Sequence, residues 1–334
     1  MKNRIGIICP SEIAFRRFMP ALKQCSEFEF IGVAAASTTE WGGTYTDEMR
    51  ANELKKAQLF IDNYGGKVFE SYTQLIESSE IDAIYLPLPP ALHYKWGKKV
   101  LENGKHLFLE KPSTTRSADT DELIGIANEK GLALHENYMF QFHSQIDHIL
   151  NMIEENKIGD IRLIRIAFGF PRRAANDFRY NKELGGGALL DCGGYTIKLA
   201  SMLLGESARI VTSHLNYIDD FDVDIFGSAT MINDEGITAQ LSFGMDNSYK
   251  CDLEIWGSAG SIFANRILTA PAGFEPVIQY KDGNNPIEEI KLDSDDTFKK
   301  SIEYFYSCIQ DDDTRTLSYK KIADQAKLVE EIKK

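Results

Sequence analysis

The sequence has little of what marks membrane proteins or proteins that bind nucleic acids. No apolar run approaches the roughly 20 residues that a membrane-spanning helix needs. Acidic residues outnumber basic residues, and the formal net charge is −13 over 334 residues. Nucleic acids and anionic membranes both reward basic surfaces, so we expect neither as a partner. A small phosphorylated ligand stays compatible with this charge, because a local site can be positive on an acidic protein.

Cysteine is also scarce. The five cysteines are scattered, odd in number and free of CxxC spacing, which argues against a disulfide framework and against a structural metal site. The first residues lead directly into an apolar strand and show no secretory hydrophobic region. We therefore expect reduced thiols, a cytoplasmic location and no bound metal. The cysteines are Cys9, Cys25, Cys192, Cys251 and Cys308.

A third deficit is glycine at the first strand–helix turn. Dinucleotide sites usually carry G-x-G-x-x-G/A there, so that backbone amides reach the pyrophosphate. Of that pattern only the last small residue is present, as Ala14, and Pro10 removes one N–H donor. Glu12 would compete with a phosphate for the helix N-terminus. This turn alone leaves dinucleotide binding open. It reads Cys9-Pro10-Ser11-Glu12-Ile13-Ala14.

The order of elements predicts the fold class. Apolar strands alternate with helices over the first 110 residues, which indicates right-handed βαβ units and a doubly wound parallel sheet of the Rossmann type. From residue 208 to 264 several strands follow one another without helices, which predicts an α+β domain with a large, mostly antiparallel sheet. Helices over about 296–310 and 318–333 close the chain. We expect an α/β protein with a dinucleotide-binding domain at 1–120 and a substrate-binding and oligomerisation domain at 121–334.

Lys111 is the first candidate catalytic residue. It follows the buried strand His106–Leu109 and precedes Pro112, which ends the strand. A lysine at the carboxyl end of a buried strand lies where open α/β sheets bind ligands. The alternative is that Glu110 and Lys111 are solvated polar residues that only end a strand.

A second cluster lies in the glycine-rich segment Gly185–Tyr195. Glycines at the entry of a helix permit close approach of the backbone to a ligand. Asp191 and Tyr195 are four residues apart, so a helix would place them on one face. A tyrosine hydroxyl beside a lysine ammonium can act as a general acid. The alternative is a core tyrosine and an ordinary polar aspartate.

The end of the second strand bears on the cofactor. An acidic residue there binds the ribose 2′-hydroxyl of NAD, whereas a basic residue accepts the 2′-phosphate of NADP. Ser37 and Thr38 stand at this position and are neither. Because the acidic residue that usually excludes the 2′-phosphate is missing, NADP is favoured slightly over NAD.

Taken together, these segments resemble the Gfo/Idh/MocA oxidoreductase family, which includes glucose–fructose oxidoreductase and inositol dehydrogenase. The resemblance covers essentially the whole chain, and the set in this order is more specific than any one member. It rests on Glu110–Pro112, on Pro90 and His93 before them, on Glu136–Met139, and on Gly185–Tyr195.

The resemblance implies a Rossmann domain and an open-sheet domain, with substrate held between them above the nicotinamide. Lys111 matches the family's catalytic lysine and Asp191 its characteristic acid. Tyr195 stands where many members have histidine. A tyrosine at this position resembles glucose–fructose oxidoreductase and the 3-ketoreductases that act on nucleotide-linked deoxysugars. The family commonly assembles as dimers or tetramers through the open sheet. Gln141 and Ser144 depart from the arginine and proline that members often carry.

The sequence therefore predicts an NAD(P)-dependent oxidoreductase that moves hydride to or from a carbon of a sugar or nucleotide sugar. Tyr195 would protonate the developing alkoxide, Lys111 would hydrogen-bond the same oxygen, and Asp191 would orient substrate hydroxyls. Two other functions stay open. One is a non-catalytic sugar-binding or assembly subunit that has lost its cofactor; the other is an enzyme that recycles a tightly held NAD for epimerisation or elimination.

The remaining expectations concern single residues. Arg172 and Arg173 are expected in a solvated loop. The expected cofactor contacts are Cys9, Ser11, Glu12, Ile13, Ser37, Thr38, Pro87, Leu88, His93, Glu110 and Lys111. The expected substrate contacts are Tyr138, Gln141, Arg179 and Tyr180.

Overall fold

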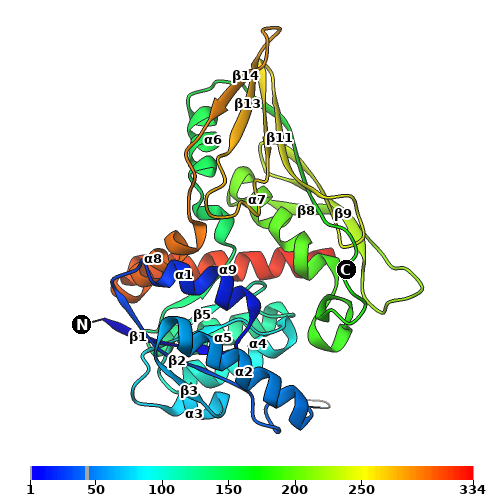
Figure 1. Ribbon diagram of the computed structural model, residues 1–334. Coiled ribbons are helices and arrows are strands. Elements are labelled where there is room, and N and C mark those ends of the chain that lie inside the picture. The colour runs from blue at the N-terminus through cyan, green and yellow to red at the C-terminus, as the bar shows by residue number, and fades with distance from the viewer. Residues whose placement is uncertain (1, 42–44, 334) are drawn as a thin grey trace. The chain divides into compact units, whose positions relative to one another are not determined.

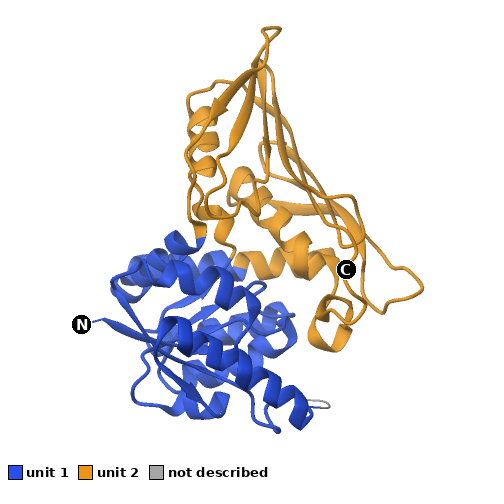
Figure 2. Cartoon of the chain, viewed as in Figure 1, with its two compact units in different colours: residues 1–137, 298–323 blue, residues 138–297, 324–334 orange. Residues whose placement is uncertain are grey.

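The computed structural model describes residues 2–41 and 45–333 (Figure 1). The chain divides into two compact units, shown in Figure 2. Residues 1–137 and 298–323 form unit 1, and residues 138–297 and 324–334 form unit 2. This division differs from the expected boundary near residue 120, because helix α5 (Ser117–Glu129) and strand β6 (Leu134–Glu136) complete the sheet of unit 1.

Unit 1 is built on a six-stranded sheet with the order β3-β2-β1-β4-β5-β6. All its strand pairs are parallel, and the chain order reverses between β1 and β4. The predicted doubly wound sheet is therefore confirmed. Its remaining strands are β1 (Asn3–Ile8), β2 (Phe28–Ala34), β3 (Lys67–Phe69), β4 (Ala83–Leu86) and β5 (His106–Leu109).

Two helices of unit 1, α2 and α3, begin at residues whose side chains cap them. Thr46 accepts a hydrogen bond from the amide of Met49, and Ser71 accepts one from the amide of Gln74. Such side-chain acceptors satisfy amides that have no partner inside the helix. The helices are a π-helical turn Ala14–Phe18 continued by α1 (Met19–Leu22), α2 (Asp47–Tyr64), α3 (Tyr72–Glu77), α4 (Pro90–Glu102) and α5.

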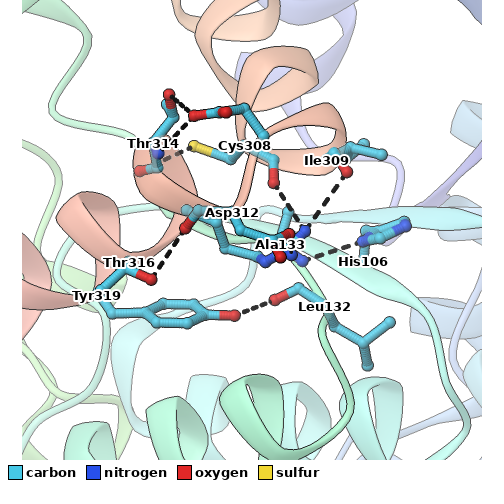
Figure 3. Close-up of polar contacts among 11 residues, drawn as sticks. His106, Leu132, Ala133, Cys308, Ile309, Asp312, Thr314, Thr316 and Tyr319 are labelled. Carbon is cyan, nitrogen blue, oxygen red and sulfur yellow. Dashed lines mark hydrogen bonds and ion pairs between the residues drawn. The ribbon is translucent and has the colours of Figure 1, made fainter.

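Helices α8 (Thr297–Gln310) and α9 (Asp312–Ile332) follow much later in the chain, yet residues 298–323 return to unit 1. Figure 3 shows how this hairpin is attached. Tyr319 attaches the hairpin to the sheet by donating a hydrogen bond to the carbonyl of Leu132, next to β6. Within the hairpin, Arg315 of α9 donates to the carbonyl of Cys308 in α8 at 3.2 Å. The amide of Ala133 donates to Nδ1 of His106 at 2.9 Å, and burial lowers the pKa of that histidine to about 4. The hairpin therefore covers the end of the sheet near β6.

Unit 2 is built on an eight-stranded sheet with the order β14-β13-β12-β11-β7-β10-β9-β8. The sheet is antiparallel except for the pair β7–β10, which confirms the predicted mostly antiparallel sheet. The sequence analysis did not anticipate β12, β13 or β14. The strands are β7 (Ile161–Gly169), β8 (Arg209–Asn216), β9 (Phe226–Ile232), β10 (Thr238–Gly244), β11 (Lys250–Gly257), β12 (Gly260–Asn265), β13 (Val277–Asp282) and β14 (Glu288–Lys291).

One face of this sheet packs on helix α7 (Gly194–Leu204), which contacts β7 and β10. Residues that alternate toward this face are buried, such as Ile166 and Leu241. The opposite face carries exposed side chains, among them Trp256 and Phe263. Helix α6 (Ser144–Glu154) precedes β7.

All five cysteines are buried, and none of them forms a disulfide bond. Within residues 2–41 and 45–333, no helix is both long and apolar enough to span a bilayer.

Candidate active site

The predicted cofactor residues of unit 1 lie at one edge of its sheet. In a parallel sheet the carboxyl ends of all strands lie on the same side, and ligands of such folds bind there. Cys9 follows β1, Ser37 comes shortly after β2, Pro87 follows β4, and Glu110 with Lys111 follows β5. The structure thus brings together residues that are up to about 100 positions apart in the sequence.

The first strand–helix turn keeps the shape of a glycine turn without glycine. Cys9 has a φ of +73°, in the left-handed region that a non-glycine residue seldom occupies. The hydroxyl of Ser11 accepts a hydrogen bond from the amide of Ala14 at 3.2 Å. Glu12 forms an exposed ion pair with Arg16 at 3.1 Å, so the carboxylate that would oppose a phosphate is partly neutralised.

Glu53 is a candidate that the sequence analysis missed. It comes from α2, but its carboxylate lies at the end of the second strand, where Oε2 accepts from the amide of Ala36 at 3.2 Å and from the hydroxyl of Tyr45 at 3.0 Å. Its Oε1 is 4.0 Å from Sγ of Cys9. Burial raises the pKa of Glu53. An acid at this position of a Rossmann fold faces the adenosine ribose, and here it is supplied from 17 residues further along the chain.

Glu110 holds the backbone next to Lys111. Its Oε1 accepts hydrogen bonds from the hydroxyl of Tyr85 and from Nδ2 of Asn137, both at 2.7 Å. Oδ1 of Asn137 in turn accepts from the hydroxyl of Ser301 at 2.8 Å. Burial raises the pKa of Glu110. This network anchors the strand end from which Lys111 projects.

His93 is completely buried and lies between two carbonyl oxygens. Its Nδ1 is 2.8 Å from the carbonyl of Pro112, and its Nε2 is 2.7 Å from the carbonyl of Leu88. Burial lowers the pKa of His93 to about 4, so the ring is neutral at pH 7 and donates to one carbonyl at a time. His93 therefore stabilises the segments after β4 and β5 through their backbones.

Tyr195 lies in an aromatic environment in unit 2. Its side chain is 6% exposed, and its hydroxyl is 3.8 Å from Sδ of Met139. The ring centroid is 5.1 Å from that of Tyr138, 5.9 Å from Phe140 and 5.4 Å from Phe168. These rings determine where the phenol oxygen points.

Asp191 precedes Tyr195 in a π-helical turn, Leu189–Gly193, that continues into α7. The expectation of one shared face assumed a regular α-helix. The carboxylate of Asp191 accepts from Nε of Arg179 at 2.7 Å, and Arg179 also contacts Asp177 at 3.1 Å. Although burial opposes it, these two carboxylates raise the pKa of Arg179. Arg179 is thus engaged by acids within the protein.

The glycines of 185–195 make room for protein groups. A Cβ on Gly194 would stand 2.2 Å from the hydroxyl of Tyr138, and one on Gly187, whose φ is +117°, would stand 2.3 Å from Oδ1 of Asp224. Asp224 accepts a hydrogen bond from the amide of Leu189 at 2.6 Å and so caps this helix. Gln141 donates from Nε2 to the carbonyl of Tyr138 at 3.1 Å. The glycines of this segment therefore allow side chains of the protein itself to pack closely against the start of the helix.

Comparison with known proteins identifies the family. The model of an oxidoreductase family with an NAD-binding Rossmann fold, Gfo/Idh/MocA, matches residues 43–138, and the model of the GFO/IDH/MocA C-terminal domain matches residues 146–263. A dTDP-3,4-didehydro-2,6-dideoxy-alpha-D-glucose 3-reductase of Actinomadura kijaniata is 36% identical over 92% of this chain and 87% of its own length. The enzyme of the same name from Streptomyces violaceoruber is 37% identical over 86% of this chain and 80% of its own length.

Solved structures agree with this relationship. The crystal structure of KijD10, a 3-ketoreductase from Actinomadura kijaniata in complex with NADP and TDP-benzene, has a TM-score of 0.91 and 34% identity, covering 100% of this chain and 97% of that one. Solved variants of KijD10 replace one lysine by alanine or glutamate and one tyrosine by phenylalanine. The predictions of the fold and of an NAD(P)-dependent oxidoreductase are confirmed, and the chain belongs to the Gfo/Idh/MocA family of oxidoreductases.

Proposed function

We propose that this enzyme uses NADPH to reduce the 3-keto group of a dTDP-linked deoxysugar. The observation that carries the proposal is a shared spacing. The lysine and the tyrosine replaced in the solved KijD10 variants are 84 positions apart, and Lys111 and Tyr195 are also separated by 84 positions. Similarity over nearly the whole length of the two 3-reductases supports the same substrate class.

The turn at Cys9 and the strand end at Glu110 would hold the cofactor, whose reduced nicotinamide would supply the hydride for the carbonyl carbon. Tyr195 gives its phenolic proton to the carbonyl oxygen, so that the ketone becomes a secondary alcohol and solvent later returns the proton to the phenolate. Lys111 donates a hydrogen bond to the same oxygen and favours the phenolate that forms. Asp191, neutralised by Arg179, accepts from substrate hydroxyl groups and orients the sugar.

Unit 1 binds the cofactor in this proposal, and unit 2 supplies most substrate contacts. The left-handed turn at Cys9 and the anchored strand end at Glu110 support the first assignment. Tyr138, Gln141 and Arg179 remain proposed substrate contacts. The hydroxyl of Tyr180 already accepts from the amide of Arg173 and donates to the carbonyl of Met245, so its contribution is to shape the loop.

The function is tested by adding NADPH and a dTDP-linked 3-keto deoxysugar to the purified protein and following oxidation of the nicotinamide. NADPH alone should raise the melting temperature, because a ligand present at 100 times its Kd stabilises the native state by about 2.7 kcal/mol. Absence of a shift with both NADPH and NADH would favour the non-catalytic sugar-binding or assembly subunit. Nucleotide that copurifies and survives turnover would favour the enzyme that recycles NAD.

Glu53 should limit the preference for NADPH. A carboxylate near the 2′ position repels the 2′-phosphate of NADPH and accepts from the 2′-hydroxyl of NADH. We expect Glu53→Gln to raise the ratio of kcat/KM for NADPH to that for NADH by about tenfold, which corresponds to about 1.4 kcal/mol. The matched control is Glu48→Gln, an exposed acid in the first turn of the same helix. An unchanged ratio would exclude contact between Glu53 and the ribose.

The same residue gives this preference a pH dependence. Burial raises the pKa of Glu53, so its charge is present above that raised pKa and disappears as the pH falls through it. The wild-type ratio of NADPH to NADH efficiency should therefore rise as the pH is lowered, beginning at a higher pH than an ordinary glutamate would give. The ratio in Glu53→Gln should not change over this range.

We also propose a cytoplasmic homodimer or homotetramer that assembles through the exposed face of the unit 2 sheet. On this face Trp256 is 56% exposed and Phe263 is 37% exposed. An ion pair between Arg165 of β7 and Glu254 of the neighbouring strand β11 lies on the same face. Large aromatic side chains beside a few charges are typical of subunit interfaces. The five cysteines, which form no disulfide bond, support a reducing compartment.

A further inference from the structure

Three arginines, Arg172, Arg173 and Arg179, lie within the segment of residues 170–180 that follows β7. Arg172 forms an ion pair with Asp246 at 2.8 Å and lies 3.7 Å from Asp220. Arg179 is engaged by Asp177 and Asp191, as described above. In the described part of the chain Arg173 has no carboxylate within ion-pair distance, although the loop belongs to an acidic protein. Arg172 and Arg173, both expected in a solvated loop, therefore differ in their ion pairing, since Arg172 pairs with two aspartates.

The backbone at Arg173 is held in place. Its amide donates to the hydroxyl of Tyr180 at 2.9 Å, and that hydroxyl donates to the carbonyl of Met245 at 3.2 Å. The ring of Tyr180 is buried and stacks on Phe221 with centroids 4.5 Å apart. An exposed guanidinium on so well anchored a backbone loses less conformational entropy when it binds a ligand.

The guanidinium also has a defined direction. Its central carbon lies 5.1 Å from the ring centroid of Phe170, a cation–π contact. The ring of Phe170 is 6.1 Å from that of Phe168, and Phe168 is 5.4 Å from Tyr195. Phe168 lies in β7, and Phe170 follows directly after the strand ends at Gly169, where its amide donates to the carbonyl of Gly244 at 3.1 Å. Residues two apart in extended chain point to the same side, which here is the side that carries Tyr195. Arg173 thus lies on the same side of unit 2 as the proposed proton donor, two aromatic rings away from it.

We propose that Arg173 binds the diphosphate of the nucleotide-linked sugar. This inference rests on the proposed function, since it takes Tyr195 as the group that meets the sugar carbonyl. In such a substrate the diphosphate is joined to the sugar ring, a short distance from the reacting carbon. A guanidinium matches two phosphate oxygens at once, and an arginine that no carboxylate neutralises keeps its full charge for them. Arg172 and Arg179 are already paired and shape the loop on either side.

The test measures binding of thymidine diphosphate and of NADPH separately by calorimetry. Arg173→Ala should raise the Kd for thymidine diphosphate at least tenfold and leave the Kd for NADPH unchanged. Arg173→Lys should fall between the two, because an ammonium keeps the charge but not the paired geometry. Arg162→Ala is the matched control, an exposed arginine on β7 that pairs with Asp160 and should alter neither Kd. In turnover, Arg173→Ala should raise KM for the nucleotide sugar and leave kcat within about twofold.

Competition separates the phosphate from the base. Inorganic pyrophosphate should displace thymidine diphosphate from the wild type, and thymidine should not. An unchanged Kd for thymidine diphosphate in Arg173→Ala would overturn the inference, and so would weaker binding of NADPH in its place. Arg173-dependent binding in an enzyme that reduces no dTDP-sugar would support this subsite while contradicting the proposed reaction. Reduction of such a sugar with no sensitivity to Arg173 would do the opposite.

Discussion

Tyr195→Phe is expected to lower kcat by about 10²- to 10⁴-fold, the range in which a positioned general acid contributes. The substitution removes only the phenolic oxygen and keeps the ring that packs against Tyr138, Phe140 and Phe168. The contact of that oxygen with Sδ of Met139 at 3.8 Å is weak, because a thioether is a poor acceptor. The stability of the protein should therefore change by less than about 1 kcal/mol. A loss of turnover in a protein that melts normally would locate the defect in proton transfer.

Single-turnover measurements of nicotinamide oxidation test this directly, since they isolate the chemical step from product release. Tyr249→Phe is the matched control, because Tyr249 is a half-exposed tyrosine of unit 2 whose hydroxyl contacts Thr269 at 3.2 Å. It should keep the wild-type kcat. A Tyr195→Phe enzyme that retained kcat within a few-fold would show that another group delivers the proton.

Lys111→Ala is expected to lower kcat by about 10²- to 10³-fold, the cost of removing one donor from a developing oxyanion. Lys111 is only partly buried at a strand end, so its removal leaves no large cavity, and the network of Glu110 still anchors the strand. NADPH should still raise the melting temperature of the variant. The measurement is kcat beside the thermal shift with NADPH.

Lys105, just before the other end of β5, provides a sharp control. Its ammonium donates to the carbonyls of Ser78 at 3.0 Å and Ile81 at 2.6 Å. Lys105→Ala should lower the melting temperature and leave kcat unchanged, the reverse of Lys111→Ala. Combining Lys111→Ala with Tyr195→Phe should lower turnover below that of either single variant, but by less than the product of the two losses, because both groups act on one oxygen. A fully multiplicative loss would mean that they act independently.

The architecture of unit 1 could be predicted because most of its strands are short apolar runs, and β1, β4 and β5 are followed within three residues by proline. Such strands are buried on both faces, so their composition alone marks them. In unit 2 most strands with one buried face were also recognised, although β12 was not. Strands β13 and β14 were missed as well, since they read Val-Ile-Gln-Tyr-Lys-Asp and Glu-Glu-Ile-Lys, without a clear alternation, and Ile278 is their one fully buried residue. Only pairing with a neighbouring strand turns such segments into a sheet.

The candidate site likewise contains residues that one segment of sequence reveals and residues that only the fold reveals. Lys111, Asp191 and Tyr195 stand in compact motifs, so a single segment was enough to find each of them. Glu53 stands in a polar helix whose pattern does not distinguish it from its neighbours, and it became visible only when its carboxylate was found on the amide of Ala36. Arg173 was likewise indistinguishable from Arg172 until their ion pairs were known.

The sequence alone was enough to predict the order of the two sheet types, most of their strands, and Lys111 and Tyr195 as candidates for proton transfer. Those features depend on composition and spacing within short segments, where each residue's neighbours are its neighbours in the chain. Three features became visible only in the folded chain: α8 and the start of α9 return to unit 1, an acid from α2 lies at the end of the second strand, and, among the described residues, no acid lies within ion-pair distance of Arg173. Each of these depends on contacts between distant segments, and charges or hydrogen bonds are satisfied by whichever partner the fold brings near.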